Sequence, residues 1–199
     1  MSTGRAGVFF DRDGTLNEEV EFLSRPEQLT MIPGAEAAVR AVNLSGMAAC
    51  VISNQSGIAR GIFSEADLTP IHERLERQLA QAGARLDSIY YCPHHPTAGI
   101  PPYNVDCECR KPGTGMLRRA ARELGIDLRR SFVVGDRLID VQAGQAAGAK
   151  GILVLTGWGQ RASAELAAGG VTPDFIAASV KEAVEFILHE SKGETGTND

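Results

Sequence analysis

Short apolar runs of strand length alternate along the chain with longer segments in which apolar residues recur at helical spacing. This alternation is typical of a parallel sheet whose strands are joined by helices that cover its faces. The pattern therefore predicts an α/β fold, a doubly wound three-layer α/β/α sandwich with a mostly parallel sheet. The expected strands are Val8–Phe10, Ala48–Ile52, Ile89–Tyr91, Phe132–Val134 and Ile152–Leu155, and the expected helices span residues 35–44, 64–81, 115–124, 140–147 and 180–189.

The chain of 199 residues is long enough for one domain that buries a core without disulfides. We expect this domain to span residues 1–190 and a disordered tail to occupy 191–199. The segment 92–111 has no clear periodicity, and a loop of this length inside a compact domain usually needs its own organiser. The stretch between Asp13 and Ser53 looks like scaffold helix and loop, so we expect no large cap domain.

Charge and hydropathy indicate which kinds of molecule the chain is expected to bind. The 25 acidic and 20 basic residues give a net charge of −5, which offers no general attraction to nucleic acid or to an anionic membrane. No apolar run approaches the roughly 20 residues that span a bilayer, and residues 1–7 lack the apolar core of a signal peptide. We therefore expect a cytoplasmic monomer that binds a small molecule, without a nucleic-acid or membrane partner.

Polar residues follow several of the predicted strands, at the sheet edge where ligands bind in open α/β folds. Asp11-Arg12-Asp13-Gly14-Thr15 follows the first strand, Ser53-Asn54 the second, and Gly135-Asp136 through Asp140 the fourth, while Lys111 ends the long loop. Taken singly, these are also ordinary turns, a helix cap and a surface lysine. Together they supply carboxylates, a hydroxyl, an amide and a cation at one edge, which favours phosphate chemistry.

These ordered motifs resemble those of the haloacid dehalogenase superfamily of phosphohydrolases, over roughly residues 5–190. The resemblance implies a phosphatase in which Asp11 is the nucleophile and Asp13 the general acid and base. Mg²⁺ would be held by Asp11, the backbone carbonyl of Asp13 and the carboxylate of Asp136. Ser53, Asn54 and Lys111 would hold the transferred phosphoryl group. Asp140 either orients Lys111 or caps the next helix, and both readings stay open.

Cys92-Pro93-His94 and Cys107-Glu108-Cys109 place three thiols and a histidine in two clusters of the long loop. This set suits tetrahedral Zn²⁺ with no open position, which marks a structural site. His95 is the alternative histidine ligand, and a pair of reduced cysteine clusters is the alternative without metal. Zinc bound by Cys92, His94, Cys107 and Cys109 would fix the loop that carries Arg110 and Lys111.

A closer resemblance is to the zinc-loop subgroup of this superfamily, which acts on a heptose bisphosphate or on histidinol phosphate. The run from Ser53 to Gly61 is similar to that of the heptose enzymes. It implies removal of the 7-phosphate of D-glycero-D-manno-heptose 1,7-bisphosphate, in the synthesis of nucleotide-activated heptose for surface polysaccharide or lipopolysaccharide. The alternatives are histidinol-phosphate phosphatase and, more distantly, a nucleic-acid end phosphatase or a non-enzymatic zinc-binding module. The residues that the resemblance places against substrate are Glu19, Phe22, Asn54, Gln55, Ser56, Arg60, Arg110 and Arg137, although each arginine could instead be a solvated surface residue.

Overall fold

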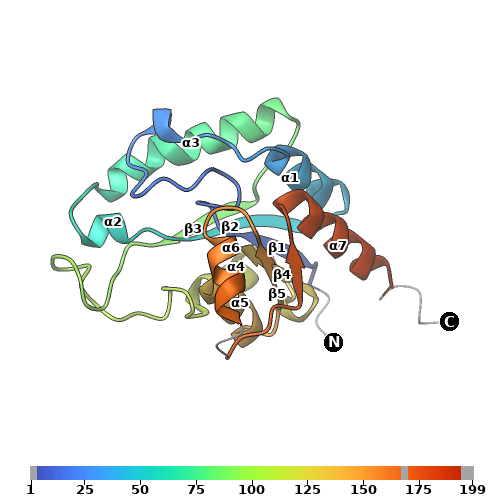
Figure 1. Ribbon diagram of the computed structural model, residues 1–199. Helices are drawn as coiled ribbons and strands as arrows, with labels where there is room; N and C mark the ends of the chain where they lie inside the picture. Colours follow the sequence, from blue (N-terminus) through green and yellow to red (C-terminus); the bar gives the residue numbers. More distant parts are fainter. Residues whose placement is uncertain (1–3, 167–169, 194–199) are drawn as a thin grey trace.

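The central feature of the fold is a sheet of six strands, all parallel, in the order β3-β2-β1-β4-β5-β6 (Figure 1). The computed structural model describes residues 4–166 and 170–193. The chain leaves the central strand β1 toward β2 and β3, and later returns to the other side of β1 as β4, β5 and β6. A crevice forms where the strand order reverses in this way, beyond the carboxyl ends of β1 and β4. The strands are β1 (Gly7–Phe10), β2 (Ala48–Asn54), β3 (Ser88–Cys92), β4 (Phe132–Gly135), β5 (Lys150–Val154) and β6 (Phe175–Ala177).

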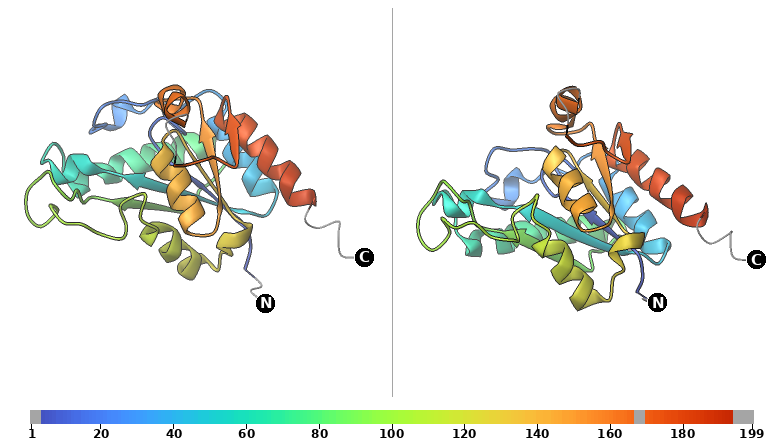
Figure 2. Two further views of the ribbon diagram at one scale, coloured as in Figure 1. Left: turned by 60° about the horizontal axis from the view of Figure 1, so that its bottom comes forward. Right: turned by 90° about the horizontal axis from the view of Figure 1, so that it is seen from below.

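Helices cover both faces of the sheet, as Figures 1 and 2 show. Helices α1, α3 and α7 lie on one face, and α4 and α5 lie on the other. Successive side chains of a strand point to opposite faces, so Val8 and Phe10 pack under the first group of helices and Phe9 packs under α4. The helices are α1 (Ala35–Leu44), α2 (Ser56–Ala59), α3 (Glu65–Gln81), α4 (Gly115–Leu124), α5 (Leu138–Ala146), α6 (Gly159–Glu165) and α7 (Val180–Gly193), with short 3-10 turns at Pro26–Gln28 and Leu128–Arg130.

All five predicted strands and all five predicted helices are present, with ends that differ by a few residues. Strand β6 and the short helices α2 and α6 were not predicted. The C-terminal boundary also needs correction, because α7 continues through Ser191 to Gly193 instead of ending before a tail. Ser191 fits into the helix because its hydroxyl donates to the carbonyl of Ile187 at 2.7 Å. The rest of the expected tail, residues 194–199, lies outside the described residues.

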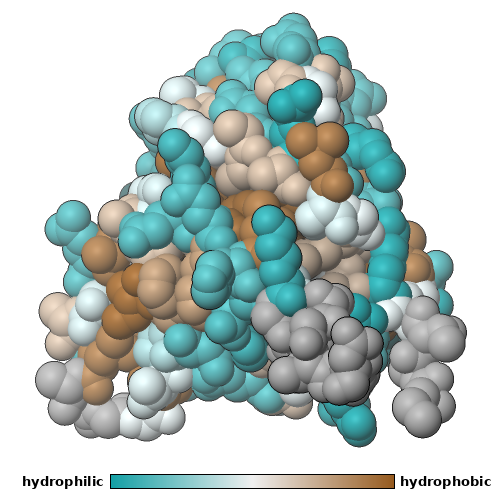
Figure 3. All heavy atoms as spheres, turned by 90° about the vertical axis from the view of Figure 1, so that its right-hand side faces the viewer, coloured by the Kyte–Doolittle hydropathy of each residue, from teal (hydrophilic) through white to brown (hydrophobic). Residues whose placement is uncertain are grey.

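None of the helices described is both long and apolar enough to cross a bilayer. The face in Figure 3, on the right-hand side of Figure 1, shows groups of hydrophobic residues separated by hydrophilic ones. Much of the surface of a folded protein is contributed by apolar atoms, so apolar residues on one face are expected.

Candidate active site and metal centres

A cavity of about 710 Å³ opens at the carboxyl edge of the sheet. Its floor is formed by residues at the ends of β1 and β2, and its walls come from the segment after β1, the segment 92–111 and the starts of α2 and α5. All the residues predicted to bind substrate line this cavity, together with the expected nucleophile, acid and lysine. They are Asp11, Asp13, Glu19, Phe22, Ser53, Asn54, Gln55, Ser56, Arg60, Arg110, Lys111 and Arg137.

Lys111 links two buried carboxylates at the floor of the cavity. Its ammonium lies 2.9 Å from Oδ1 of Asp11 and 2.6 Å from Oδ1 of Asp140, and it donates to the carbonyl of Ile52 at 2.9 Å. Burial would lower the pKa of Lys111, but the two carboxylates outweigh burial and raise it above its usual value. Lys111 is therefore a permanent, fixed cation beside the expected nucleophile.

Asp140 performs both of the roles that the sequence left open. While its Oδ1 binds Lys111, its Oδ2 accepts a hydrogen bond from the backbone N–H of Arg137 at 3.0 Å, at the start of α5. A Cβ built on Gly135 would lie 2.3 Å from the Asp140 carboxyl carbon, so a side chain at Gly135 would displace this carboxylate. One residue thus caps the helix and orients the lysine.

Asp11, Asp136 and Asp140 form a buried group whose carboxylate oxygens lie within 4.8 Å of one another. Burial raises the pKa values of Asp11 and Asp136, and the neighbouring carboxylates raise them further. Three carboxylates against the single charge of Lys111 leave the cluster in need of a further cation. The Oδ1 atom of Asp136 is buried without a hydrogen-bond partner, although buried carboxylate oxygens normally have one. These residues fit a hard divalent cation such as Mg²⁺.

Asp13 lies at the cavity wall, held by its neighbours in a salt bridge and several hydrogen bonds. Arg12 contacts both carboxylate oxygens at 2.7–2.9 Å, and the amides of Asn17 and Gln55 donate to them at 2.9 and 3.0 Å. Burial by itself would raise the pKa of Asp13, but Arg12, Asn17 and Gln55 lower it below its usual value. Asp13 is therefore a carboxylate in this structure, the form of a general base.

Asn54, which is expected to help hold the phosphoryl group, lines the cavity and also contacts the backbone of Lys111. Its Oδ1 accepts the backbone N–H of Lys111 at 3.0 Å, and its Nδ2 donates to the carbonyl of Lys111 at 3.1 Å. Asn54 thus fixes the backbone that carries the catalytic-site lysine. The hydroxyl of Ser53 accepts a hydrogen bond from Gln55 at 2.7 Å, on the floor of the cavity.

Three arginines stand around the cavity, and each has a neighbour that restrains it. The guanidinium of Arg60 lies 5.8 Å from the ring centre of Phe22, and that of Arg137 lies 5.5 Å from the ring of Trp158. Phe22 has a φ of 53°, a left-handed conformation that is uncommon for a bulky residue and that occurs often at functional sites. Arg110 donates to the carbonyl of His94 at 3.1 Å.

Two parts of the site are not predicted from the sequence. Arg12 is fully buried and binds Asp13, although it carries no predicted role. The loop after β5 was also overlooked. There, the hydroxyl of Thr156 donates to the carbonyl of Gly14 at 2.6 Å, and the backbone N–H of Trp158 donates to Oδ2 of Asp136 at 2.7 Å. This loop also follows a strand of the sheet, at the edge where ligands bind in open α/β folds.

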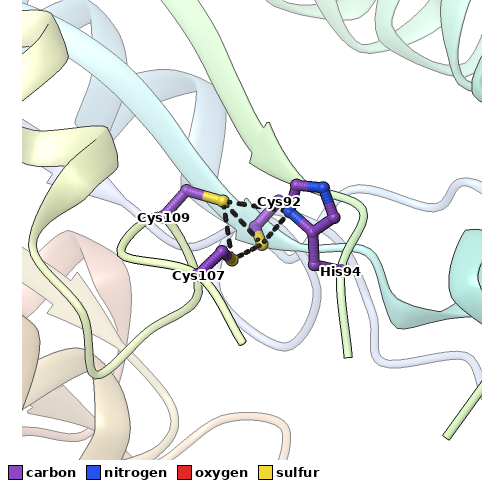
Figure 4. A group of neighbouring side chains, drawn as sticks. All are labelled: Cys92, His94, Cys107 and Cys109. Carbon is purple, nitrogen blue, oxygen red and sulfur yellow. Dashed lines mark hydrogen bonds between the residues drawn. The ribbon is translucent and has the colours of Figure 1, made fainter. Parts of the chain in front are cut away.

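The side chains of Cys92, His94, Cys107 and Cys109 converge on one point, as Figure 4 shows. The sulfur atoms lie 2.9–3.4 Å apart, and Nδ1 of His94 lies 3.4 Å from Sγ of Cys109. Thiolate and imidazole ligands in a closed set of four suit structural Zn²⁺. His95 lies apart from this cluster, on the cavity wall, where its Nδ1 accepts the N–H of Ala98 at 3.0 Å.

The chain has close relatives among known proteins. Residues 108–183 match the HAD-hydrolase-like family. The D-glycero-D-manno-heptose-1,7-bisphosphate 7-phosphatase of Thermosynechococcus vestitus is 44% identical over 187 residues, which cover 92% of this chain and 95% of the relative. The D-glycero-beta-D-manno-heptose-1,7-bisphosphate 7-phosphatase of Escherichia coli K12 is 39% identical over 96% of this chain and 98% of the relative. The crystal structure of D,D-heptose 1,7-bisphosphate phosphatase from B. bronchiseptica, complexed with magnesium and phosphate, superposes with a TM-score of 0.82 at 35% identity and covers 93% of this chain and 99% of that one.

Proposed function

Because the chain belongs to the HAD-like hydrolases, among relatives that are heptose bisphosphate phosphatases, we propose that it removes the 7-phosphate of D-glycero-D-manno-heptose 1,7-bisphosphate. The observation that carries this proposal is the composition of one cavity. Its floor holds Asp11 against Lys111 at 2.9 Å, and its walls carry three arginines. The floor suits the phosphate that reacts, and the arginines suit a second phosphate on the same small molecule.

In the proposed mechanism Asp11 attacks the phosphorus atom, and the bond to the sugar oxygen breaks as the aspartyl-phosphate forms. Lys111 and the backbone N–H of Arg12, which donates to Oδ1 of Asp11 at 2.8 Å, fix the orientation of the nucleophile. Mg²⁺ held by Asp11, Asp136 and the backbone carbonyl of Asp13 would neutralise charge on the phosphoryl oxygens. Lys111 supplies the same kind of stabilisation from its fixed position, and the hydroxyl of Ser53 donates to the phosphoryl group.

Asp13 handles the protons in both steps. In the first step it gives a proton to the sugar oxygen that leaves, and in the second it accepts a proton from the water that attacks the aspartyl-phosphate. The hydrogen bonds around Asp13 hold it ionised, the form needed for the second step. For the first step it has to exchange part of its contact with Arg12 for a proton when substrate enters.

The proposed enzyme also binds a structural zinc ion and acts in the cytoplasm. Zn²⁺ bound by the three cysteines and His94 would fix the loop that carries Arg110 and Lys111. Free thiols in such a site suit a reducing compartment, which supports a cytoplasmic enzyme. The product would feed the synthesis of nucleotide-activated heptose for lipopolysaccharide or another surface polysaccharide, and we expect the enzyme to act as a monomer.

The test is phosphate release from both anomers of the heptose bisphosphate and from histidinol phosphate, with and without Mg²⁺. We expect the heptose bisphosphate to be the better substrate by kcat/KM, and activity to require Mg²⁺. Asp11→Asn keeps the shape of the side chain but removes the nucleophile, so turnover should fall by at least about 10³-fold while the fold is kept. Activity of that variant within a few-fold of wild type would exclude the covalent mechanism, and a preference for histidinol phosphate would overturn the proposed substrate.

A further inference from the structure

Trp158 stands between two neighbouring hollows of the surface. It lines the catalytic cavity, and it also lines a second hollow of about 370 Å³ beside it, which shares Arg137 and Ile139 with the first. Its side chain is well exposed, at 41% for the residue. A single exposed aromatic residue is not unusual. The contacts of this one are what distinguish it.

The backbone around Trp158 is fixed by two hydrogen bonds. Its N–H donates to Oδ2 of Asp136 at 2.7 Å, and the loop that carries it is tied to the β1 loop by the bond from Thr156 to Gly14. A Cβ built on Gly157 would lie 2.2 Å from Oδ2 of Asp136, so only glycine allows this approach. The indole ring is therefore held in place relative to the catalytic floor.

The side chain of Trp158 contacts two pocket residues of opposite charge. The Arg137 guanidinium lies over the indole ring, 5.5 Å from its centre. The indole N–H also interacts with the Glu19 carboxylate on the cavity wall. Burial and the charge of Asp13 raise the pKa of Glu19, while Arg137 and Trp158 act in the opposite direction and favour its ionised form. Glu19 and Arg137 carry opposite charges, and the Trp158 side chain interacts with each of them.

We propose that Trp158 is a specificity-determining residue, which positions Glu19 and Arg137 so that one binds sugar hydroxyls and the other binds the part of the substrate that does not react. Without the ring, the carboxylate and the guanidinium would be free to pair with each other, and their polar atoms would no longer face the substrate. The inference rests on the proposed function, because it concerns the non-reacting part of a sugar phosphate. It predicts an effect on binding of the sugar and none on transfer of the phosphoryl group.

The test compares Trp158→Phe and Trp158→Ala with wild type on the heptose bisphosphate and on p-nitrophenyl phosphate, at saturating Mg²⁺. Phenylalanine keeps a ring under Arg137 but removes the N–H, and alanine removes both. For the bisphosphate we expect KM to rise roughly 5-fold in the first variant and roughly 20-fold in the second, with kcat within about twofold. For the aryl phosphate kcat/KM should stay within about twofold in both. Arg161→Ala, which alters only the second hollow, is the matched control, and it should leave KM and kcat unchanged for both substrates.

A double variant separates positioning from simple loss of packing. If Trp158 acts through Glu19, then Trp158→Phe should add little to the effect of Glu19→Gln, because the contact is already lost. Equal losses on both substrates, an unchanged KM for the bisphosphate, or fully additive effects with Glu19→Gln would overturn the assignment of Trp158. A wild-type protein that cleaves the aryl phosphate but not the bisphosphate would instead overturn the proposed substrate, so the two failures are distinguishable.

Discussion

Arg110→Ala removes a cation from the cavity wall without touching the catalytic carboxylates. Arg110 is part-buried, and one of its nitrogens is used by the carbonyl of His94 at 3.1 Å. Burial lowers the pKa of Arg110, and the like charges of Arg60 and Arg137 lower it further, while the thiols of Cys92 and Cys107 act in the opposite direction. Cations that repel one another in a shared cavity are stabilised when an anion enters. A second phosphate dianion is such an anion, and a monophosphate does not supply it.

The expected loss in kcat/KM follows from the hydrogen bonds to substrate that Arg110→Ala would remove. A hydrogen bond to a charged group contributes about 1.5–3 kcal/mol, which corresponds to roughly 10- to 100-fold in kcat/KM. We expect this loss on the heptose bisphosphate and a change within about twofold on p-nitrophenyl phosphate. Arg110→Lys is the matched variant. It keeps the charge but loses the planar fork, so its loss should lie between those of wild type and alanine.

The assay measures kcat/KM for both substrates at saturating Mg²⁺, together with the zinc content of each variant. The zinc content has to be measured because the hydrogen bond from Arg110 to the carbonyl of His94 also supports the segment 92–111. A selective loss on the bisphosphate with zinc retained supports the role of Arg110 in binding the second phosphate. An equal loss on both substrates would refute it, since Arg110 would then support the reacting phosphate or the loop itself.

Two further predictions concern the loop and the fold. Cys107→Ala should lower the zinc content, the thermal midpoint and the activity. Cys50→Ala alters a buried cysteine that is not a member of the cluster, so this variant should keep stoichiometric zinc through dialysis. A zinc-free Cys107→Ala protein with full activity would contradict this prediction. Asp87→Asn should lower the free energy of unfolding by about 1–2 kcal/mol at pH 7, because Asp87 accepts the N–H of Ala49 at 2.9 Å and binds Arg5 at 2.9 Å. Burial would raise the pKa of Asp87, but these partners lower it, so its contribution is present at neutral pH and is lost as pH falls through the lowered pKa. Urea unfolding of both proteins at pH 7 and pH 3 checks this, since the difference should shrink at pH 3.

Much of the fold could be predicted because its long elements have clear hydrophobic patterns. Strands β1 and β4 are apolar runs buried on both faces, and the charged outer face of α3 contrasts with its buried leucines. The elements that were missed are short. Strand β6 has three residues, α2 has four and α6 has seven, too few for a period to stand out, and both of these helices contain glycine.

The candidate site was predictable where acidic or basic residues follow a strand, and unpredictable where backbone geometry matters. Asp11 and Asp136 were predicted because acidic residues follow more than one strand and the ends of parallel strands meet at one edge of the sheet. Trp158 was missed because its contact with Asp136 is made by a backbone N–H, which any residue type has. Arg12 was missed because strand alternation would point it away from its neighbours, whereas the turn after β1 buries it completely against Asp13.

The expected zinc centre and the catalytic floor are connected by a short path. Cys92 ends β3, where its carbonyl accepts the N–H of Gln55 at 2.8 Å at the end of β2. Cys109 precedes Lys111 by two residues, and Asn54 holds the backbone of Lys111 through two hydrogen bonds. Burying the charge of a lysine raises the free energy of the folded state unless an opposite charge compensates it. Lys111 is therefore stable only where it reaches Asp11 and Asp140. A metal bound by Cys92 and Cys109 would therefore also set the position of this cation. Such a coupling would give a physical reason for the short path between the cysteine cluster and the floor of the cavity.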